Sequence, residues 1–128
     1  MTLIRQMRGD AAEKLAQGST ITLAYYELGN ALWRECFLLK RISREETEQL
    51  LKAIYPIIGE MNKSQVDNEA QASSVLALAC KFNLTFYDAA YLAEASKTKR
   101  TLVTDDKKLA KAAQNLGVET LTSNAFIQ

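Results

Sequence analysis

The sequence predicts an α/β fold, in which helices cover a parallel sheet in a three-layer α/β/α arrangement. Short apolar runs that contain β-branched residues recur along the chain, around Ile21 and Leu23, at Thr101–Thr104 and at Val118–Leu121. Longer segments with apolar residues three or four positions apart separate these runs, and such spacing is typical of helices. Strands that alternate with helices are the pattern of a parallel sheet between helical layers.

The composition fits one domain, residues 1–128, with a core of its own. The chain has 128 residues, of which 48% are apolar and 24% charged, which suits a single hydrophobic core. Sixteen basic and fifteen acidic side chains give a net charge of +1, so any surface that binds nucleic acid has to be local. Basic residues cluster in three places: Arg5 and Arg8; Arg34, Lys40, Arg41 and Arg44; and Lys97, Lys99, Arg100, Lys107, Lys108 and Lys111. The simplest explanation of any one cluster is a solvated helix face.

Histidine is absent from the sequence, which excludes Ser-His-Asp and Cys-His nucleophiles, histidine general bases and histidine-bound zinc. Carboxylates are the groups that remain for such chemistry. Cys36 and Cys80 lie in predicted helices without CxxC spacing, so we expect two small buried side chains rather than a catalytic or zinc site. No apolar run approaches the roughly 18 residues of a membrane span, and the start lacks a signal-peptide pattern. We therefore expect a cytoplasmic protein without a membrane partner.

The first third of the chain predicts a helix, a strand and a second helix. Apolar residues form one stripe over Ile4–Ala16, and Gly18 ends that helix. Ile21 and Leu23 alternate with threonines, as in a short strand. The helix that follows has a core-facing stripe over Tyr25–Leu39.

A capping box marks the next helix. Ser43 can accept a hydrogen bond from the amide of Glu46, and the Glu46 side chain can reach back to the serine amide. We expect this helix to run toward Ile58, with Pro56 ending or kinking it near Tyr55.

A polar connection over Asn62–Asp67 leads to an alanine-rich helix over Asn68–Phe82, which Asn83 closes in the left-handed conformation. Thr85 can cap another helix that runs to about Lys97.

The last part alternates strand and helix again. The strand Thr101–Thr104 leads into a helix over Asp106–Leu116, which Gly117 closes. Val118–Leu121 forms a last strand, and Ser123 begins a final turn whose apolar side chains, Phe126 and Ile127, pack back.

Acidic residues follow these strands and begin these helices. Asp105 and Asp106 come directly after a strand, and ligands of open α/β sheets collect at the carboxyl ends of strands. Asp88, in the first turn of its helix, joins them if that helix starts at the same edge. Glu27 follows the first strand, with Asn30 one turn on. We expect Glu27 to be buried among tyrosines and leucines, which is costly unless it binds a cation or several donors.

Structural explanations of these acids stay open. Thr85 and Asp88 can form a capping box, and Asp105 or Asp106 at a helix start gains from the helix dipole. Glu27 can pair with a lysine or an arginine. If the carboxylates do bind a metal, oxygen ligands without His or Cys select Mg²⁺ or Mn²⁺, which serve metal-dependent phosphodiester hydrolysis.

Three motifs give the chain its resemblance to a known family. They are Tyr-Tyr-Glu-Leu-Gly-Asn-Ala-Leu-Trp at 25–33, Leu-Thr-Phe-Tyr-Asp-Ala-Ala-Tyr-Leu-Ala at 84–93 and Leu-Val-Thr-Asp-Asp-Lys-Lys-Leu at 102–109. In order and spacing, from about Thr20 to Phe126, the sequence resembles the PIN-domain family, most closely the toxin ribonucleases of VapC type.

The resemblance implies a site. Glu27, Asp88 and Asp106 match the family's acids that bind Mg²⁺ or Mn²⁺, and Thr104 would position a water or a carboxylate. Asp105 falls at a variable position, as a bystander or a substitute ligand. Asn30 matches a frequent polar neighbour of the glutamate.

Members of the family usually open with an apolar strand that ends in Asp-Thr-Ser or Asp-Ala-Ser, and this aspartate is a principal metal ligand. Nothing here matches it, since Asp10 reads as a helix-surface acid. By resemblance, the domain lacks its N-terminal strand and first catalytic aspartate. The chain is then truncated, borrows a strand from a partner, or is a degenerate homologue.

The resemblance implies a metal-dependent endoribonuclease whose basic residues near Lys107 and Lys108 hold the backbone of single-stranded or looped RNA. The implied partners are a second copy of the chain and a cognate antitoxin protein. Two alternatives stay open: a catalytically impaired module that binds an antitoxin or dimerises, and a hydrolase of simple phosphate esters.

Overall fold

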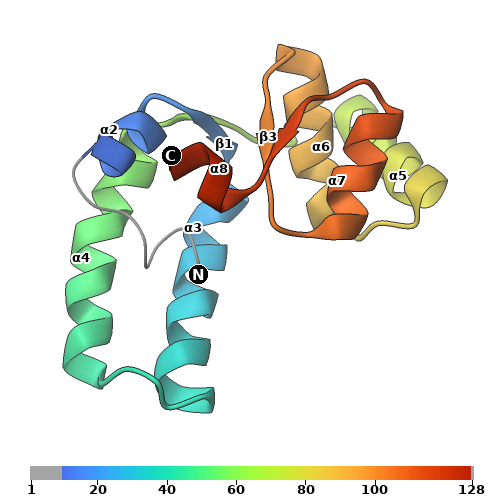
Figure 1. Ribbon diagram of the computed structural model, residues 1–128. Helices are drawn as coiled ribbons and strands as arrows, with labels where there is room; N and C mark the ends of the chain where they lie inside the picture. Colours follow the sequence, from blue (N-terminus) through green and yellow to red (C-terminus); the bar gives the residue numbers. More distant parts are fainter. Residues whose placement is uncertain (1–9, 128) are drawn as a thin grey trace. The chain divides into compact units, whose positions relative to one another are not determined.

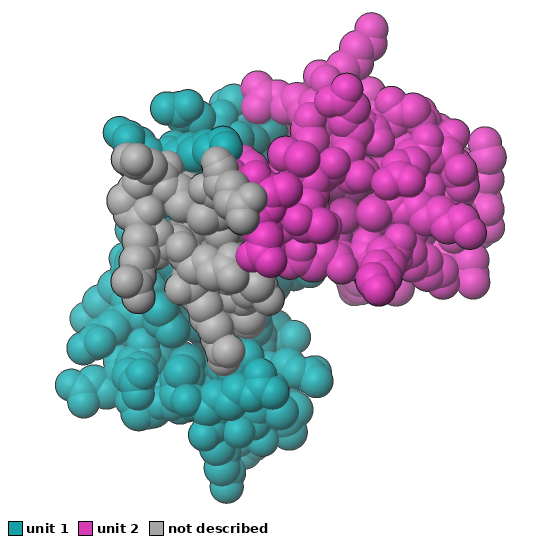
Figure 2. Space-filling model, in the orientation of Figure 1, with its two compact units in different colours: residues 1–63 teal, residues 64–128 magenta. Residues whose placement is uncertain are grey.

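Residues 10–127 are described by the computed structural model, in which the chain divides into two units (Figure 2). Unit 1 comprises residues 1–63 and unit 2 comprises residues 64–128. The predicted helix over Ile4–Ala16 is confirmed from Asp10 onward, and its first six residues lie outside the described part. None of the described helices combines the length and the apolarity that crossing a membrane requires.

Unit 1 is built on two long helices (Figure 1). α2 (Asp10–Ala16) and strand β1 (Ser19–Ile21) lead into α3 (Leu23–Trp33), which continues as a π-helical segment, η1 (Arg34–Leu38). α4 (Arg44–Glu60) packs along α3. The buried residues that join the two helices are Leu28, Leu32, Ile54 and Ile58.

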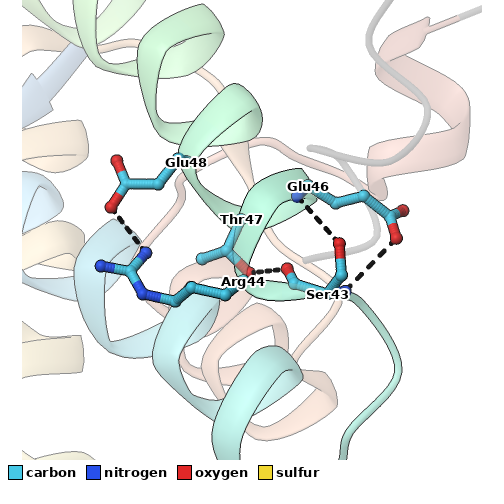
Figure 3. Close-up of polar contacts among 5 residues, drawn as sticks. All are labelled: Ser43, Arg44, Glu46, Thr47 and Glu48. Atoms are coloured by element: carbon cyan, nitrogen blue, oxygen red, sulfur yellow. Dashed lines mark hydrogen bonds and ion pairs between the residues drawn. The ribbon is translucent and has the colours of Figure 1, made fainter.

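The predicted capping box at the start of α4 is confirmed (Figure 3). The Ser43 Oγ accepts from the amide of Glu46 at 3.0 Å, and the Ser43 amide donates to Glu46 Oε1 at 3.3 Å. The Thr47 hydroxyl also donates to the Ser43 carbonyl at 2.7 Å. These bonds satisfy groups that the first helical turn otherwise leaves without partners.

The helix runs past Ile58 as predicted, and of the two effects expected of Pro56, ending the helix near Tyr55 does not occur, because α4 continues through the proline to Glu60. Proline removes one helical hydrogen bond and costs about 3 kcal/mol in a helix interior. Ile54 and Ile58, on either side of Pro56, are both buried in the core shared with α3. Their packing keeps the helix continuous where local propensity opposes it.

The two strands of the first sheet differ from the prediction. The strand expected around Ile21 and Leu23 is Ser19–Ile21, and Leu23 already belongs to α3. The connection predicted over Asn62–Asp67 contains strand β2 (Asn62–Ser64), which pairs with β1. Backbone pairing fixes β2 although its side chains are polar, so hydrophobic alternation does not reveal it.

Unit 2 begins with two packed helices, α5 (Glu69–Phe82) and α6 (Phe86–Thr98). Asn68 caps α5 through its side chain, and Asn83 closes it in the left-handed conformation with φ of 54°, as predicted. Thr85 caps α6, because its hydroxyl accepts from the amide of Asp88 at 3.1 Å.

The second part of unit 2 contains a parallel strand pair. β3 (Leu102–Val103) pairs in parallel with β4 (Thr120–Leu121), as the sequence predicted, and α7 (Lys107–Asn115) connects them. Gly117 follows α7 with φ of 81°, a conformation that glycine adopts without strain. α8 (Ser123–Ile127) comes after β4. The buried core of these elements consists of Leu92, Ala95, Leu102, Leu109, Ala112, Ala113 and Val118.

The expectation of two buried cysteines was wrong. Cys36 is partly buried and Cys80 is exposed. α5 buries Val75 and Ala79, and Cys80, one residue after Ala79, lies about 100° around the helix from that face.

Candidate functional site

Polar side chains collect where the two parallel strands of unit 2 end. Thr104, Asp105 and Asp106 follow β3, and Ser123 follows β4. Parallel strands have their carboxyl ends at one edge, so these residues share what we call the carboxyl edge of unit 2. Ligands bind at such edges in open α/β sheets.

Asp106 is held by the backbone that surrounds it. Its Oδ1 accepts from the amides of Lys108 at 2.9 Å and Leu109 at 3.0 Å, which makes Asp106 the N-cap of α7. Its own amide donates to the Thr104 Oγ1 at 3.1 Å. Both of these capping hydrogen bonds are accepted by Oδ1. Asp106 can therefore cap α7 and bind a metal through Oδ2 at the same time. Asp106 itself is exposed.

Asp88 lies in the first turn of α6 and is partly buried. Its amide makes one of the two bonds of the predicted capping box, to Thr85. α6 and α7 pack together and start at the same end of unit 2, at the bottom of the view in Figure 1. Asp88 and Asp106, which begin these helices, therefore belong to the same edge.

Asp105 has a partner that the sequence did not indicate. Its Oδ1 accepts from the Ser123 amide at 2.8 Å, and its Oδ2 accepts from the Ser123 hydroxyl at 2.7 Å. The hydrogen bonds from the Ser123 hydroxyl and amide lower the pKa of Asp105 below its ordinary value. Ser123 is only 3% exposed. The two residues thus link the turn after β3 to the start of α8.

Glu27 and Asn30 lie on α3 in unit 1, and both are exposed. The expectation that Glu27 is buried was wrong, because α3 turns Leu28 and Leu32 toward the core and Glu27 lies beside that stripe. Among the described residues of unit 1, Glu35 in η1 is a buried acid, at 5% exposure. Its Oε1 is 3.5 Å from the Arg41 guanidinium, a pairing over six residues that the i,i+3 and i,i+4 rules for helices do not predict.

Within each unit, over residues 10–127, no three acidic or cysteine side chains gather as metal ligands. Asp88 and Asp106 belong to unit 2, whereas Glu27 belongs to unit 1. Of these three carboxylates, those of Asp88 and Asp106 thus lie within one unit. Two carboxylates with substrate phosphates are nevertheless a common way to hold Mg²⁺, which usually keeps several waters.

The basic residues near the carboxyl edge are fewer than the sequence grouping indicated. Lys107 and Lys108 are exposed at the start of α7, beside Asp106. Lys97, Lys99 and Arg100 are exposed at the other end of α6. The cluster therefore divides between the start of α7 and the end of α6.

Known proteins resemble this chain in sequence and in fold, although no protein-family model matches it. It is 36% identical over 110 residues to Exonuclease VapC9 of Pyrobaculum aerophilum, covering 85% of this chain and 75% of the relative. It is 31% identical over 113 residues to Ribonuclease VapC3 of the same organism, covering 84% and 82%.

The fold is similar to the crystal structure of PAE2754 from Pyrobaculum aerophilum. The TM-score is 0.64 at 25% identity, and the match covers 84% of this chain and 72% of that one. This likeness, with the parallel pairing of β3 and β4, confirms the α/β fold class that the sequence predicted. The chain belongs to the VapC family of PIN-domain proteins.

Proposed function

We propose that this protein is a VapC-type toxin, an endoribonuclease that uses Mg²⁺ or Mn²⁺ to hydrolyse RNA phosphodiester bonds. The names of its relatives, an exonuclease and a ribonuclease, support nuclease chemistry. The observation that carries the proposal is the common edge of Asp88 and Asp106, at the starts of α6 and α7. Two carboxylates at the carboxyl edge of parallel strands suit a divalent cation.

Each proposed residue has a separate task. Asp88 and Asp106 hold the cation through carboxylate oxygens, and Glu27 is a third ligand on the resemblance alone. Thr104 fixes the backbone of Asp106 through the 3.1 Å hydrogen bond that its hydroxyl accepts. A Mg²⁺ or Mn²⁺ ion held there would activate a water and neutralise the negative charge on the phosphoryl oxygens.

The substrate that we propose is single-stranded or looped RNA, whose unpaired segments can be splayed into a site. Lys107 and Lys108 are exposed beside Asp106, where their ammonium groups can bind the phosphates that flank the cleaved bond. Such contacts make the affinity sensitive to salt.

A cognate antitoxin and a second copy of the chain are the protein partners that we propose. Unit 1 supports the second copy, since α3 and η1 expose large apolar side chains. Trp33 is 50% and Phe37 69% exposed, and their rings stack with centroids 5.9 Å apart. Exposed aromatic side chains of this size are enriched at protein interfaces.

A circular single-stranded RNA tests the proposal, because it has no end for an exonuclease to attack. We expect Mn²⁺-dependent linearisation by the wild type, reduced by about 100-fold or more in Asp88→Asn and Asp106→Asn, since even indirect losses at metal sites cost 10–100-fold. Asparagine still caps α7, so folding is kept. Asp67→Asn, at an exposed aspartate before α5, is the matched control and should cleave normally.

Two results would contradict the proposal. Degradation of linear RNA alone would indicate an exonuclease, and cleavage that survives both asparagine variants would exclude the carboxylate site.

A second candidate function is a catalytically impaired module that binds an antitoxin or dimerises. It is favoured by the absence, within either unit of the described chain, of three gathered acidic ligands. This candidate predicts that the wild type leaves circular and linear RNA intact and still self-associates or binds an antitoxin.

A further inference from the structure

Each of the three successive residues after β3 forms hydrogen bonds with a different partner. The Thr104 amide donates to the Leu121 carbonyl of β4 at 2.9 Å. Asp105 accepts both hydrogen bonds from Ser123. The Asp106 amide then donates to the Thr104 hydroxyl at 3.1 Å. The turn that carries Asp106 is thus fastened to β4 and to the start of α8.

The hydrogen bonds between Asp105 and Ser123 are the strongest of these interactions. They are short, at 2.8 Å and 2.7 Å, and they join a carboxylate to two donors, which makes them stronger than bonds between neutral groups. Ser123 is almost fully buried, so its side chain has a fixed position. They also span 18 residues, so they hold two separate segments together rather than one local turn.

We propose that Asp105 is a positioning residue: through Ser123 it fixes the turn between β3 and α7 and thereby orients the Asp106 carboxylate for metal binding. Both Asp105 oxygens already accept from Ser123, which favours this role over that of a substitute ligand. The part that concerns metal rests on the proposed function. The orientation of Asp106 itself can be measured without metal.

The amides of Lys108 and Leu109 report that orientation, because both donate to Asp106 Oδ1. Hydrogen exchange of these two amides is measured by NMR in the metal-free protein. The Val118 amide, which donates to the Ala113 carbonyl in the core, reports opening of the whole unit. Calorimetry with Mn²⁺ on the same samples gives the metal affinity.

Three variants separate the alternatives. Asp105→Ala removes both bonds. Asp105→Asn keeps them, since the amide oxygen accepts from the Ser123 amide and the amide nitrogen donates to its hydroxyl. Thr122→Ala is the matched control, because Thr122 accepts from the Ala125 amide at 3.2 Å and does not contact Asp105 in the described hydrogen bonds.

We expect Asp105→Ala to speed exchange at Lys108 and Leu109 relative to Val118 and to weaken Mn²⁺ binding about tenfold, the usual cost of losing a group that orients a ligand. Asp105→Asn and Thr122→Ala should match the wild type in both measurements. Unchanged exchange and affinity in Asp105→Ala would overturn the proposal.

Loss of Mn²⁺ binding in Asp105→Asn with unchanged exchange would also overturn it, because Asp105 would then be a ligand. A wild type that binds no Mn²⁺ would refute the proposed metal site, and the exchange rates alone would then decide whether Asp105 positions Asp106.

Discussion

Two neighbouring aspartates of the turn after β3 have different hydrogen-bond partners. Asp106 accepts from the first amides of α7, whereas Asp105 accepts from Ser123 at the start of α8. Identical side chains thus stabilise different parts of the chain: Asp106 caps α7, and Asp105 links the turn after β3 to the start of α8. Sequence analysis located both residues but not this division, because the partner of Asp105 lies 18 positions away.

The capping role of Asp106 can be separated from its charge. Asparagine and aspartate cap helices about equally well, whereas alanine at such a position costs about 0.5–2 kcal/mol. We therefore expect Asp106→Asn to keep the free energy of unfolding and Asp106→Ala to lose about 1 kcal/mol, measured by urea denaturation. RNA cleavage should be lost in both. Full activity in Asp106→Asn would show that the carboxylate serves only as a cap.

The stability that Asp105 contributes depends on pH. Its folded-state pKa lies below the ordinary value because of the Ser123 hydrogen bonds. The stabilisation is therefore complete above the ordinary pKa and is lost as the pH falls through the lowered folded-state pKa. We expect the difference in unfolding free energy between the wild type and Asp105→Ala to stay constant near neutral pH and to shrink as the pH falls through the ordinary aspartate pKa and below it, measured in a chelator. A constant difference over that fall in pH would contradict the assignment.

At the scale of elements, the candidate site lies where α6 and α7 begin, because both helices start at the same end of unit 2 (Figure 1). The carboxyl edge of unit 2 has acids at both helix starts and two lysines in the first turn of α7. The helix dipole stabilises acidic side chains at the start of a helix, whereas it does not stabilise lysines there. Helix stability therefore does not explain Lys107 and Lys108, which is consistent with the RNA binding that we propose for them.

The two lysines should determine part of the salt dependence of RNA binding. For single strands, each phosphate contact contributes about 0.7 to the slope of log affinity against log salt concentration. We expect Lys107→Ala/Lys108→Ala to weaken RNA binding and to lower that slope by about 1.4. Lys97→Ala/Arg100→Ala, at the other end of α6, is the control and should keep the wild-type slope. Equal losses in both double variants would indicate a diffuse charge effect.

The exposed face of α3 and η1 should mediate self-association. Trp33→Ser/Phe37→Ser removes the stacked pair from the surface of unit 1. We expect the mass measured by light scattering after gel filtration to fall toward that of one chain, whereas Leu76→Ser, at a lone exposed leucine of α5, leaves it unchanged. A mass that the double variant does not alter would locate any dimer interface elsewhere.

Elements with strong local signals were predicted well. The Ser43 capping box, the left-handed Asn83 and the strand before Asp105 all follow from short-range chemistry. The differences from the prediction arose where tertiary contacts determine the structure. Packing around Ile54 and Ile58 carries α4 through Pro56, and pairing with β1 makes a strand of the polar Asn62–Ser64 segment.

At the scale of the whole molecule, the candidate ligands are divided between two units. Unit 2 holds Asp88 and Asp106, and unit 1 holds Glu27. Each unit has its own buried cluster, so each can keep its candidate ligands in place by its own packing. The sequence could predict the three acids from spaced motifs, but not that Glu27 is exposed, because burial depends on which face of α3 meets α4.

Calorimetric titration of Mn²⁺ tests the central claim most directly, with the wild type compared with Asp88→Asn, Asp106→Asn, Glu27→Gln and the control Asp67→Asn. The proposal predicts one site in the wild type and in the control, lost in Asp88→Asn and Asp106→Asn, and weakened in Glu27→Gln. No binding by the wild type, or binding that survives both asparagine variants, would contradict a metal site at the carboxyl edge of unit 2.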